Sequence, residues 1–111
     1  MGLRVAQSPR MEGMSMEITV TNQGGRYEIA LDGSLDAFGA SDLGKTLEEI
    51  PADAEWLTMD MTKLEYTSSA GIRQIVTAHK KMKGNLTLKN VGPEVLDVLQ
   101  MTGIDKKMNI E

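Results

Sequence analysis

The chain has 111 residues, which is enough for one domain and too few for two. It is 41% hydrophobic and 25% charged, the balance of an ordinary soluble globular protein, and its net charge of −4 argues against direct nucleic-acid binding, which needs clustered Lys and Arg. No stretch has the length and apolarity of a membrane span or a signal peptide, and the absence of Cys excludes disulfides, thiolate metal ligands and a thiol nucleophile. We therefore expect a cytoplasmic domain that binds neither nucleic acid nor membrane.

The N-terminal part of the chain changes character near residue 16. Residues 1–15 show no hydrophobic period and mix Gly, Pro, Ser and Arg, so we expect a flexible leader there. Residues 17–22 and 26–32 are predicted to form two strands, joined in a hairpin by Gly24 and Gly25. The domain is therefore expected to begin with an antiparallel strand pair.

Helix and strand patterns alternate through the rest of the chain. The apolar spacing and the Pro and Gly stop signals predict, in order, a helix over 40–50, a strand over 56–61, a helix over 69–83, a strand over 85–89 and a helix over 93–103. The order β-β-α-β-α-β-α predicts an α/β fold, with helices packed on a mixed sheet of four to five strands. Strands that alternate with helices are parallel and joined by right-handed crossovers.

Polar loops follow two of the predicted strands. The loop at 33–40 contains Asp36, and the turn at 66–71 contains Ser68 and Ser69. In a parallel arrangement, every strand-to-helix loop emerges at the carboxyl edge of the sheet. If the two strands pair directly, these side chains should form one small polar surface.

A serine at a helix start has two compatible interpretations. Either Ser68 or Ser69 can cap the helix by accepting a hydrogen bond from a free backbone N–H, which is the default role of Ser there. The same position also tolerates a phosphate, because free N–H groups and the positive end of the helix dipole favour negative charge. Capping and regulation by phosphorylation therefore both stay open.

An ordered set of short motifs gives the chain a family resemblance. The motifs are residues 31–36 (LDGSLD), 59–64 (MDMTKL), 68–72 (SSAGI), 86–90 (LTLKN), 95–99 (VLDVL) and 101–104 (MTGI). Together they resemble successive landmarks of the STAS domain family, which includes anti-sigma factor antagonists. The resemblance covers nearly all of residues 16–111, which we expect to be one STAS-like domain.

The resemblance implies a phosphorylation site. In that family the helix-start motif is commonly Asp-Ser-Ser/Ala-Gly-Leu, and its first Ser is phosphorylated. Ser69 matches that serine, while Ser68 stands where the Asp is usual and is the alternative acceptor. The partner-binding residues that the resemblance implies are Asp36, Ser68, Ser69, Gly71 and Ile72.

The resemblance also implies a cycle of partner binding. The unphosphorylated protein would bind an anti-sigma factor that is also a serine protein kinase, phosphorylation would release it, and a phosphatase of the PP2C type would reset it. Neither a cofactor nor a metal is implied. The alternative function is a non-switching STAS-type interaction subunit of a transport or signalling assembly.

An enzyme with a serine nucleophile is not indicated. Such a serine needs a base within about 2.6–3.2 Å. The one histidine, His79, lies ten residues further along the same predicted helix than Ser69, or about 15 Å away at 1.5 Å per residue. Because His79 falls within the apolar stripe of that helix, a packed structural role is expected for it.

Overall fold

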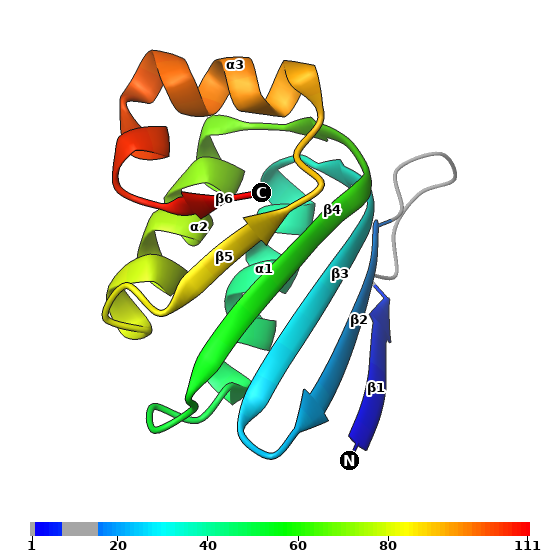
Figure 1. Ribbon diagram of the computed structural model, residues 1–111. Coiled ribbons are helices and arrows are strands. Elements are labelled where there is room, and N and C mark those ends of the chain that lie inside the picture. The colour runs from blue at the N-terminus through cyan, green and yellow to red at the C-terminus, as the bar shows by residue number, and fades with distance from the viewer. Residues whose placement is uncertain (1, 8–15) are drawn as a thin grey trace.

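The computed structural model describes residues 2–7, as backbone only, and residues 16–111 (Figure 1). Over this part of the chain the strands are β1 (Gly2–Gln7), β2 (Met16–Gln23), β3 (Arg26–Leu35), β4 (Trp56–Thr67), β5 (Leu86–Lys89) and β6 (Asn109–Ile110). The helices are α1 (Ala37–Glu49), α2 (Ser69–Lys81), α3 (Pro93–Thr102) and the short 3-10 helix η1 (Ile104–Lys106). This arrangement confirms the predicted α/β class and the β-β-α-β-α-β-α order of the central elements.

The strands form one mixed sheet in the order β1-β2-β3-β4-β5-β6. The pairs β1/β2 and β2/β3 are antiparallel, whereas the pairs β3/β4, β4/β5 and β5/β6 are parallel. The turn between β2 and β3 is built from Gly24 and Gly25, whose φ angles of 59° and 91° favour glycine. The predicted hairpin is therefore confirmed.

The helices α1 and α2 cover one face of the sheet, and α3 lies at its upper end in Figure 1. The core lies between the sheet and the helices, where alternate strand residues meet the apolar faces of α1 and α2. Its fully buried members include Ile29, Leu31, Leu43, Leu57, Met59, Ile75, Leu86 and Leu88. Burying each such side chain stabilises the fold by about 1.5–3 kcal/mol, so this layer sets the orientation of both helices.

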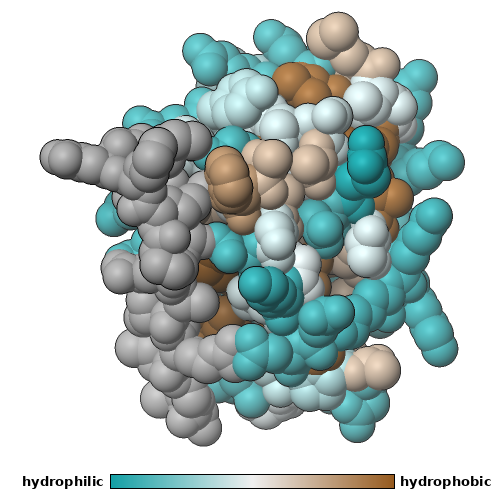
Figure 2. Space-filling view, turned by 180° about the vertical axis from the view of Figure 1, so that it is seen from behind, coloured by the Kyte–Doolittle hydropathy of each residue, from teal (hydrophilic) through white to brown (hydrophobic). Residues whose placement is uncertain are grey.

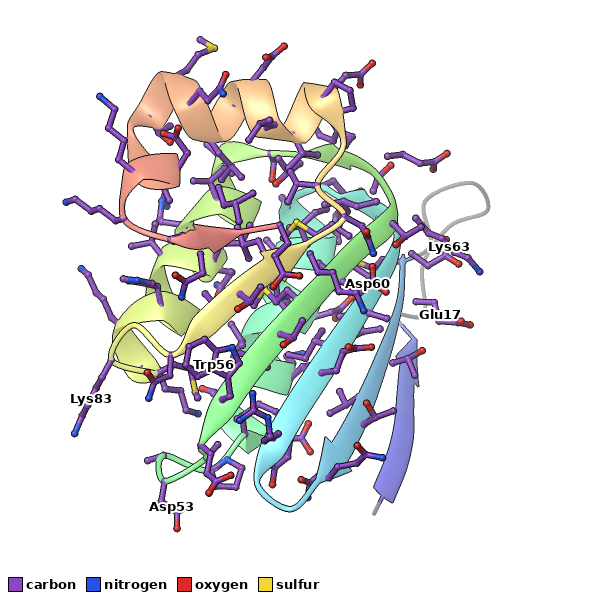
Figure 3. All side chains as sticks on the ribbon, in the orientation of Figure 1. Glu17, Asp53, Trp56, Asp60, Lys63 and Lys83 are labelled. Carbon is purple, nitrogen blue, oxygen red and sulfur yellow. The ribbon has the colours of Figure 1, made fainter. Side chains whose placement is uncertain are left out.

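The two outer surfaces of the molecule differ. The sheet face turned toward the viewer in Figure 1 carries no helix. Asp60 and Trp56, both from β4, are among the residues on this side of the molecule (Figure 3). Seen from behind, the helix side has a mixed surface in which hydrophilic residues surround smaller apolar areas (Figure 2). In residues 16–111, no helix has the length and apolarity needed to cross a membrane.

The structure differs from the sequence-based expectations at both edges of the sheet. Residues Gly2–Gln7 of the predicted leader form β1, which pairs antiparallel with β2, while the rest of the leader lies outside the described residues. At the other edge, Asn109–Ile110 form β6 beside β5. A two-residue strand such as β6 is too short to show alternation, and the six residues of β1 carry only two large apolar residues, Leu3 and Val5.

Three further element ends differ from the predictions by two or three residues. The helix α1 begins at Ala37 rather than residue 40, because Asp36 caps it. The helix α2 ends at Lys81 rather than residue 83, since Lys83 has a φ of 53° and leaves the helix. The strand β3 continues through Gly33, with a φ of 116°, to Leu35.

The strand β4 is six residues longer than predicted and is irregular. Its pairing with β3 shifts register twice, between Ala30 and Asp32 and again between Gly33 and Ser34. Each shift gives β4 one residue more than β3, as in a β-bulge, and bulges change the face to which side chains point. As a result Glu65 and Tyr66 are both exposed although they are adjacent, which hides the strand pattern in the sequence.

Candidate functional site: two helix starts at one sheet edge

The neighbouring parallel strands β3 and β4 end side by side. Their last residues, Leu35 and Thr67, are register partners. The next residue in each case, Asp36 or Ser68, is the N-cap of the helix that follows. The structure thus brings Asp36 and Ser68 to adjacent positions at the carboxyl edge of the sheet, with the starts of α1 and α2 directly behind them.

Asp36 fixes the start of α1. Its Oδ1 accepts a hydrogen bond of 2.8 Å from the backbone N–H of Gly39. Gly39 is buried, and a Cβ there would lie 2.9 Å from the carbonyl oxygen of Ser34 and 3.1 Å from Sδ of Met16. The carboxylate of Asp36 is therefore committed to the helix start, and only a glycine fits three residues later.

Ser68 fixes the start of α2 with both functions of its hydroxyl. Its Oγ accepts a hydrogen bond of 3.2 Å from the backbone N–H of Gly71. The same hydroxyl donates to the carbonyl oxygen of Leu35 at 2.9 Å, and the Ser68 backbone N–H donates to that oxygen at 2.8 Å. Ser68 therefore joins the start of α2 to the end of β3.

Ser69 is the first residue of α2, and its side chain is exposed. Within the described chain its hydroxyl makes no hydrogen bond. The adjacent serines thus differ in chemistry, because one hydroxyl is part of the fold and the other is displayed to solvent. A group attached to Ser69 would lie at the positive end of the α2 dipole.

The remaining residues of the predicted partner-binding set lie beneath this surface. A Cβ at Gly71 would lie 2.5 Å from Oγ1 of Thr67 and 2.6 Å from Cδ2 of Leu35, so Gly71 is a packing position. Ile72 is only 6% exposed and belongs to the core cluster. Gly71 and the side chain of Ile72 are therefore packed inside and support the helix start, and a direct contact of these two residues with a partner stays a prediction.

Two exposed aromatic residues close to this edge were not predicted as site residues. Phe38, in the first turn of α1, is 59% exposed, and Tyr66, one residue before the end of β4, is 54% exposed. The bulges of β4 that expose Tyr66 depend on its pairing with β3, and no sequence pattern indicates them. We name the surface formed by Asp36, Phe38, Tyr66, Ser68 and Ser69 the carboxyl-edge surface.

A second polar cluster lies on the open face of the sheet. An open depression of about 310 Å³ there is lined by eight residues, among them Glu17, Asp60 and Lys63 (Figure 3). Burial acts to raise the pKa of Asp60, but hydrogen bonds from Thr62 and Asn90 and the charge of Lys89 outweigh it, so the pKa lies below its ordinary value. Because these hydrogen bonds engage Asp60, we regard it as part of the sheet structure.

Residues 16–111 contain no group of three or more His, Asp or Glu side chains arranged to hold a metal ion. His79, on α2, is half-buried, and its carbonyl oxygen accepts a hydrogen bond of 3.0 Å from the N–H of Gly84. It lies ten residues beyond Ser69 along α2, so it is placed in the body of the helix rather than at the carboxyl-edge surface.

Comparison with protein families identifies the class. A family model described as "Mlab, STAS domain" matches residues 18–110. The chain therefore belongs to the STAS domain family, as the motifs predicted. A search of curated proteins finds no match for the sequence.

Solved structures share the fold at low sequence identity. An anti-sigma factor antagonist from Mycobacterium paratuberculosis is 21% identical, with a TM-score of 0.79 over 88% of this chain and 86% of that one. An anti-sigma-factor antagonist (STAS) domain protein from Planctomyces limnophilus is 22% identical, with a TM-score of 0.68 over 84% and 87%. The phosphorylated form of SpoIIAA, a Bacillus cell fate determinant, is 16% identical, with a TM-score of 0.68 over 85% and 90%. At these identities the likeness establishes the fold.

Proposed function

We propose that this STAS domain is an anti-sigma factor antagonist, which binds an anti-sigma factor with serine kinase activity until phosphorylation of Ser69 releases it. The observation that carries the proposal is the difference between two neighbouring hydroxyls. Ser68 uses its hydroxyl twice within the fold, whereas Ser69 is exposed and makes no hydrogen bond within the described chain. Of the two predicted acceptors, Ser69 is thus the one that a kinase can modify without disturbing the structure.

The comparisons support this proposal at the level of the fold. Three of the similar solved structures are named as anti-sigma factor antagonists or as a domain protein of that type. One of them, SpoIIAA, has been determined in an unphosphorylated and in a phosphorylated form. A protein with this fold is thus known in two phosphorylation states. We extend that property to Ser69 of this chain.

The physical argument is that a phosphate on Ser69 alters binding while leaving the fold intact. It adds a charge of about −1.5 to −2, which the α2 dipole favours by about 0.3–1 kcal/mol at an exposed position. Shifting a complex from 99:1 to 1:99 takes about 5.5 kcal/mol of differential affinity. A dianion that is desolvated or placed opposite like charge in an interface can supply several kcal/mol of this.

A phosphate on Ser68 instead of Ser69 would disturb the fold. Ser68 would lose the proton that it donates to Leu35, and its oxygen would be drawn away from the N–H of Gly71. Losing an N-cap costs about 0.5–2 kcal/mol, before any strain from placing a phosphate in a half-buried position. Modification of Ser68 would therefore loosen the start of α2.

In this proposal the partner contacts the carboxyl-edge surface, with Asp36, Ser68 and Ser69 at its centre and Gly71 and Ile72 supporting α2 from below. The protein works by binding rather than by catalysis, in the cytoplasm. The partner kinase supplies the nucleotide and a PP2C-type phosphatase removes the phosphate.

The first test is phosphorylation itself. Purified protein is incubated with lysate of the source cells with and without ATP, recovered with its bound partners, and mapped by mass spectrometry. We expect one added phosphate on Ser69, together with ATP-dependent release of a serine kinase. Ser41→Ala, which alters an exposed serine of α1, is the matched control for Ser69→Ala. Only Ser69→Ala should lose the phosphate and keep the partner bound with ATP.

The second test separates a switch from a permanent contact. Ser69→Asp carries about one negative charge against nearly two for the phosphate, so it should weaken partner binding while stability changes by less than about 0.5 kcal/mol. If wild-type protein recovers a partner without any phosphate on Ser69, and Ser69→Asp binds it equally well, the proposal fails. That result would favour the non-switching interaction subunit of a transport or signalling assembly.

A further inference from the structure

The residue one helical turn beyond Ser69 is Arg73, which is exposed on α2. Within the described chain its guanidinium makes no ion pair or hydrogen bond, and only its backbone carbonyl is engaged, by the hydroxyl of Thr77 at 2.9 Å. The neighbouring residue, Gln74, occupies the α1–α2 contact instead, since a Cβ at Gly44 would lie 3.0 Å from its Nε2. Arg73 is therefore not required to hold the two helices together.

Helix geometry places Arg73 over Ser69. Residues four apart lie on the same face of a helix, about 5–6 Å apart at Cβ, and long side chains lean toward the N-terminus. A guanidinium at position 73 thus covers the turn that begins with Ser69. The order, with an anion at i and a cation at i+4, is also the one that the helix dipole favours.

No other basic residue of α2 lies near Ser69. Among residues 69–78 it is the one Lys, Arg or His, and the next basic residues, His79, Lys80 and Lys81, fall in the last turn. At 1.5 Å per residue, Lys80 lies about 16 Å further along the axis than Ser69. The start of α2 therefore pairs one modifiable hydroxyl with one guanidinium.

We propose that Arg73 binds the phosphate of phosphorylated Ser69 as an intramolecular clamp. This inference rests on the proposed function, because it concerns the phosphorylated state of the same site. The guanidinium is planar and can donate two parallel hydrogen bonds to phosphate oxygens, which an ammonium cannot match in geometry. The clamp orders the phosphate on the surface of α2 and neutralises part of its charge.

With the clamp, the surface that α2 presents to a partner differs in two ways between the unphosphorylated and the phosphorylated protein. Before phosphorylation, the first turns of α2 present a free hydroxyl and a free guanidinium. Afterwards they present a phosphate and a guanidinium that is already occupied. Phosphorylation therefore adds negative charge and removes an exposed hydrogen-bond donor in one step.

The test uses protein in which phosphoserine is incorporated at position 69 during translation, so that no kinase is needed. The second ionisation of the phosphate, ordinarily near pH 6, is followed by phosphorus NMR during a pH titration. The α2 dipole and Arg73 favour the dianion, whereas the carboxylate of Asp36 at the adjacent helix start opposes it. Arg73→Gln should raise the phosphate pKa by about 0.2–0.4 units, the shift that corresponds to the strength of an i, i+4 ion pair.

The matched control is Lys80→Gln, which removes the same charge from an exposed position near the far end of the same helix. It should leave the phosphate pKa within about 0.1 units of the unsubstituted protein, because water and salt screen charges over such distances. Arg73→Lys should give an intermediate value, since it keeps the charge and loses the planar fork. Equal shifts for Arg73→Gln and Lys80→Gln would overturn the clamp.

Failure of the clamp and failure of the proposed function are distinguishable. If the encoded phosphoserine shows no dependence on Arg73 while the lysate still phosphorylates Ser69, the clamp is wrong and the switch stands. If the lysate leaves Ser69 unmodified while the titration shows the dependence on Arg73, the local geometry is right and the regulatory role is wrong.

Discussion

The starts of α1 and α2 lie side by side and are built on the same plan. Each has a polar cap, two further residues and a buried glycine: Asp36 with Gly39, and Ser68 with Gly71. In both, the side-chain oxygen of the cap accepts a hydrogen bond from the glycine N–H, at 2.8 Å and 3.2 Å respectively. The difference that matters for the proposed function lies in the residue after the cap, which is Ala37 in α1 and Ser69 in α2.

This comparison separates structure from function within a few residues. The two helix starts share the cap and the glycine. The fold needs both, because they allow each helix to begin directly after its strand while packing closely on the neighbouring strand end. What differs, an exposed hydroxyl followed by an arginine one turn later, has no role in the packing. The part of the site that carries the proposed function is therefore the part that the structure does not require.

The largest effect should come from filling the glycine positions. Gly71→Ala would force a Cβ to within 2.5 Å of Thr67 and 2.6 Å of Leu35, both buried, so we expect a loss of stability of about 2–3 kcal/mol. Gly39→Ala meets the Ser34 carbonyl at 2.9 Å and should cost about 1–2 kcal/mol. Urea unfolding of both variants measures the difference.

The control for this pair is Gly44→Ala, a helical glycine whose Cβ would meet only the end of the Gln74 side chain. Because that side chain can move and Ala favours helix, stability should change by less than about 1 kcal/mol. If Gly71→Ala were as mild as Gly44→Ala, the close packing described at the start of α2 would be wrong.

The next largest effect should come from the caps. Asp36→Ala and Ser68→Ala should each lower stability by about 1 kcal/mol, with Ser68→Ala the more costly because it also removes the hydrogen bond to Leu35. Ser68→Asp, which copies the cap of α1 into α2, should recover part of the loss. Thermal unfolding checks the order, with Thr77→Ala on the exposed face of α2 as the control. A loss for Ser68→Ala no larger than that for Thr77→Ala would contradict the assigned cap.

The smallest effect on stability should come from moving the hydroxyl. The double variant Ser69→Ala with Ala37→Ser transfers an exposed serine from α2 to the matching position of α1, and stability should change by less than about 0.5 kcal/mol. It should gain no phosphate in the lysate assay, because a kinase that recognises the residues around Ser69 meets a different sequence around residue 37, where Phe38 follows instead of Ala70. Phosphate at position 37 of the double variant would show that any serine after a cap suffices.

The sequence predicted the fold well where periodicity is strong. The α2 stripe of Ile72 and Ile75 and the alternation of β3 specify elements whose type is right and whose ends shift by a few residues. The secondary-structure prediction failed where a strand depends on its pairing with neighbouring strands. Residues 62–66 of β4 lose their alternation to bulges, and the short edge strands β1 and β6 owe their existence to neighbouring strands.

The candidate site was predictable in position and not in detail. The rule that parallel strands end at one edge brings Asp36 and Ser68 together, and both residue types are typical N-caps. The motif favoured Ser69 as the acceptor and kept Ser68 as the alternative. The different roles of the two hydroxyls depend on the carbonyl of Leu35, which is 33 residues away along the chain from Ser68, and no local pattern contains that contact.

The bond between Ser68 and Leu35 has a dynamic consequence. It ties the first turn of α2 to a strand in the middle of the sheet, so that turn cannot fray on its own as exposed helix ends usually do. The amide protons of Ser68 and Gly71 should therefore exchange with deuterium as slowly as those of β3 and β4, with or without a phosphate on Ser69. A binding partner would then meet the same backbone in both states and distinguish them by the side chains that it displays.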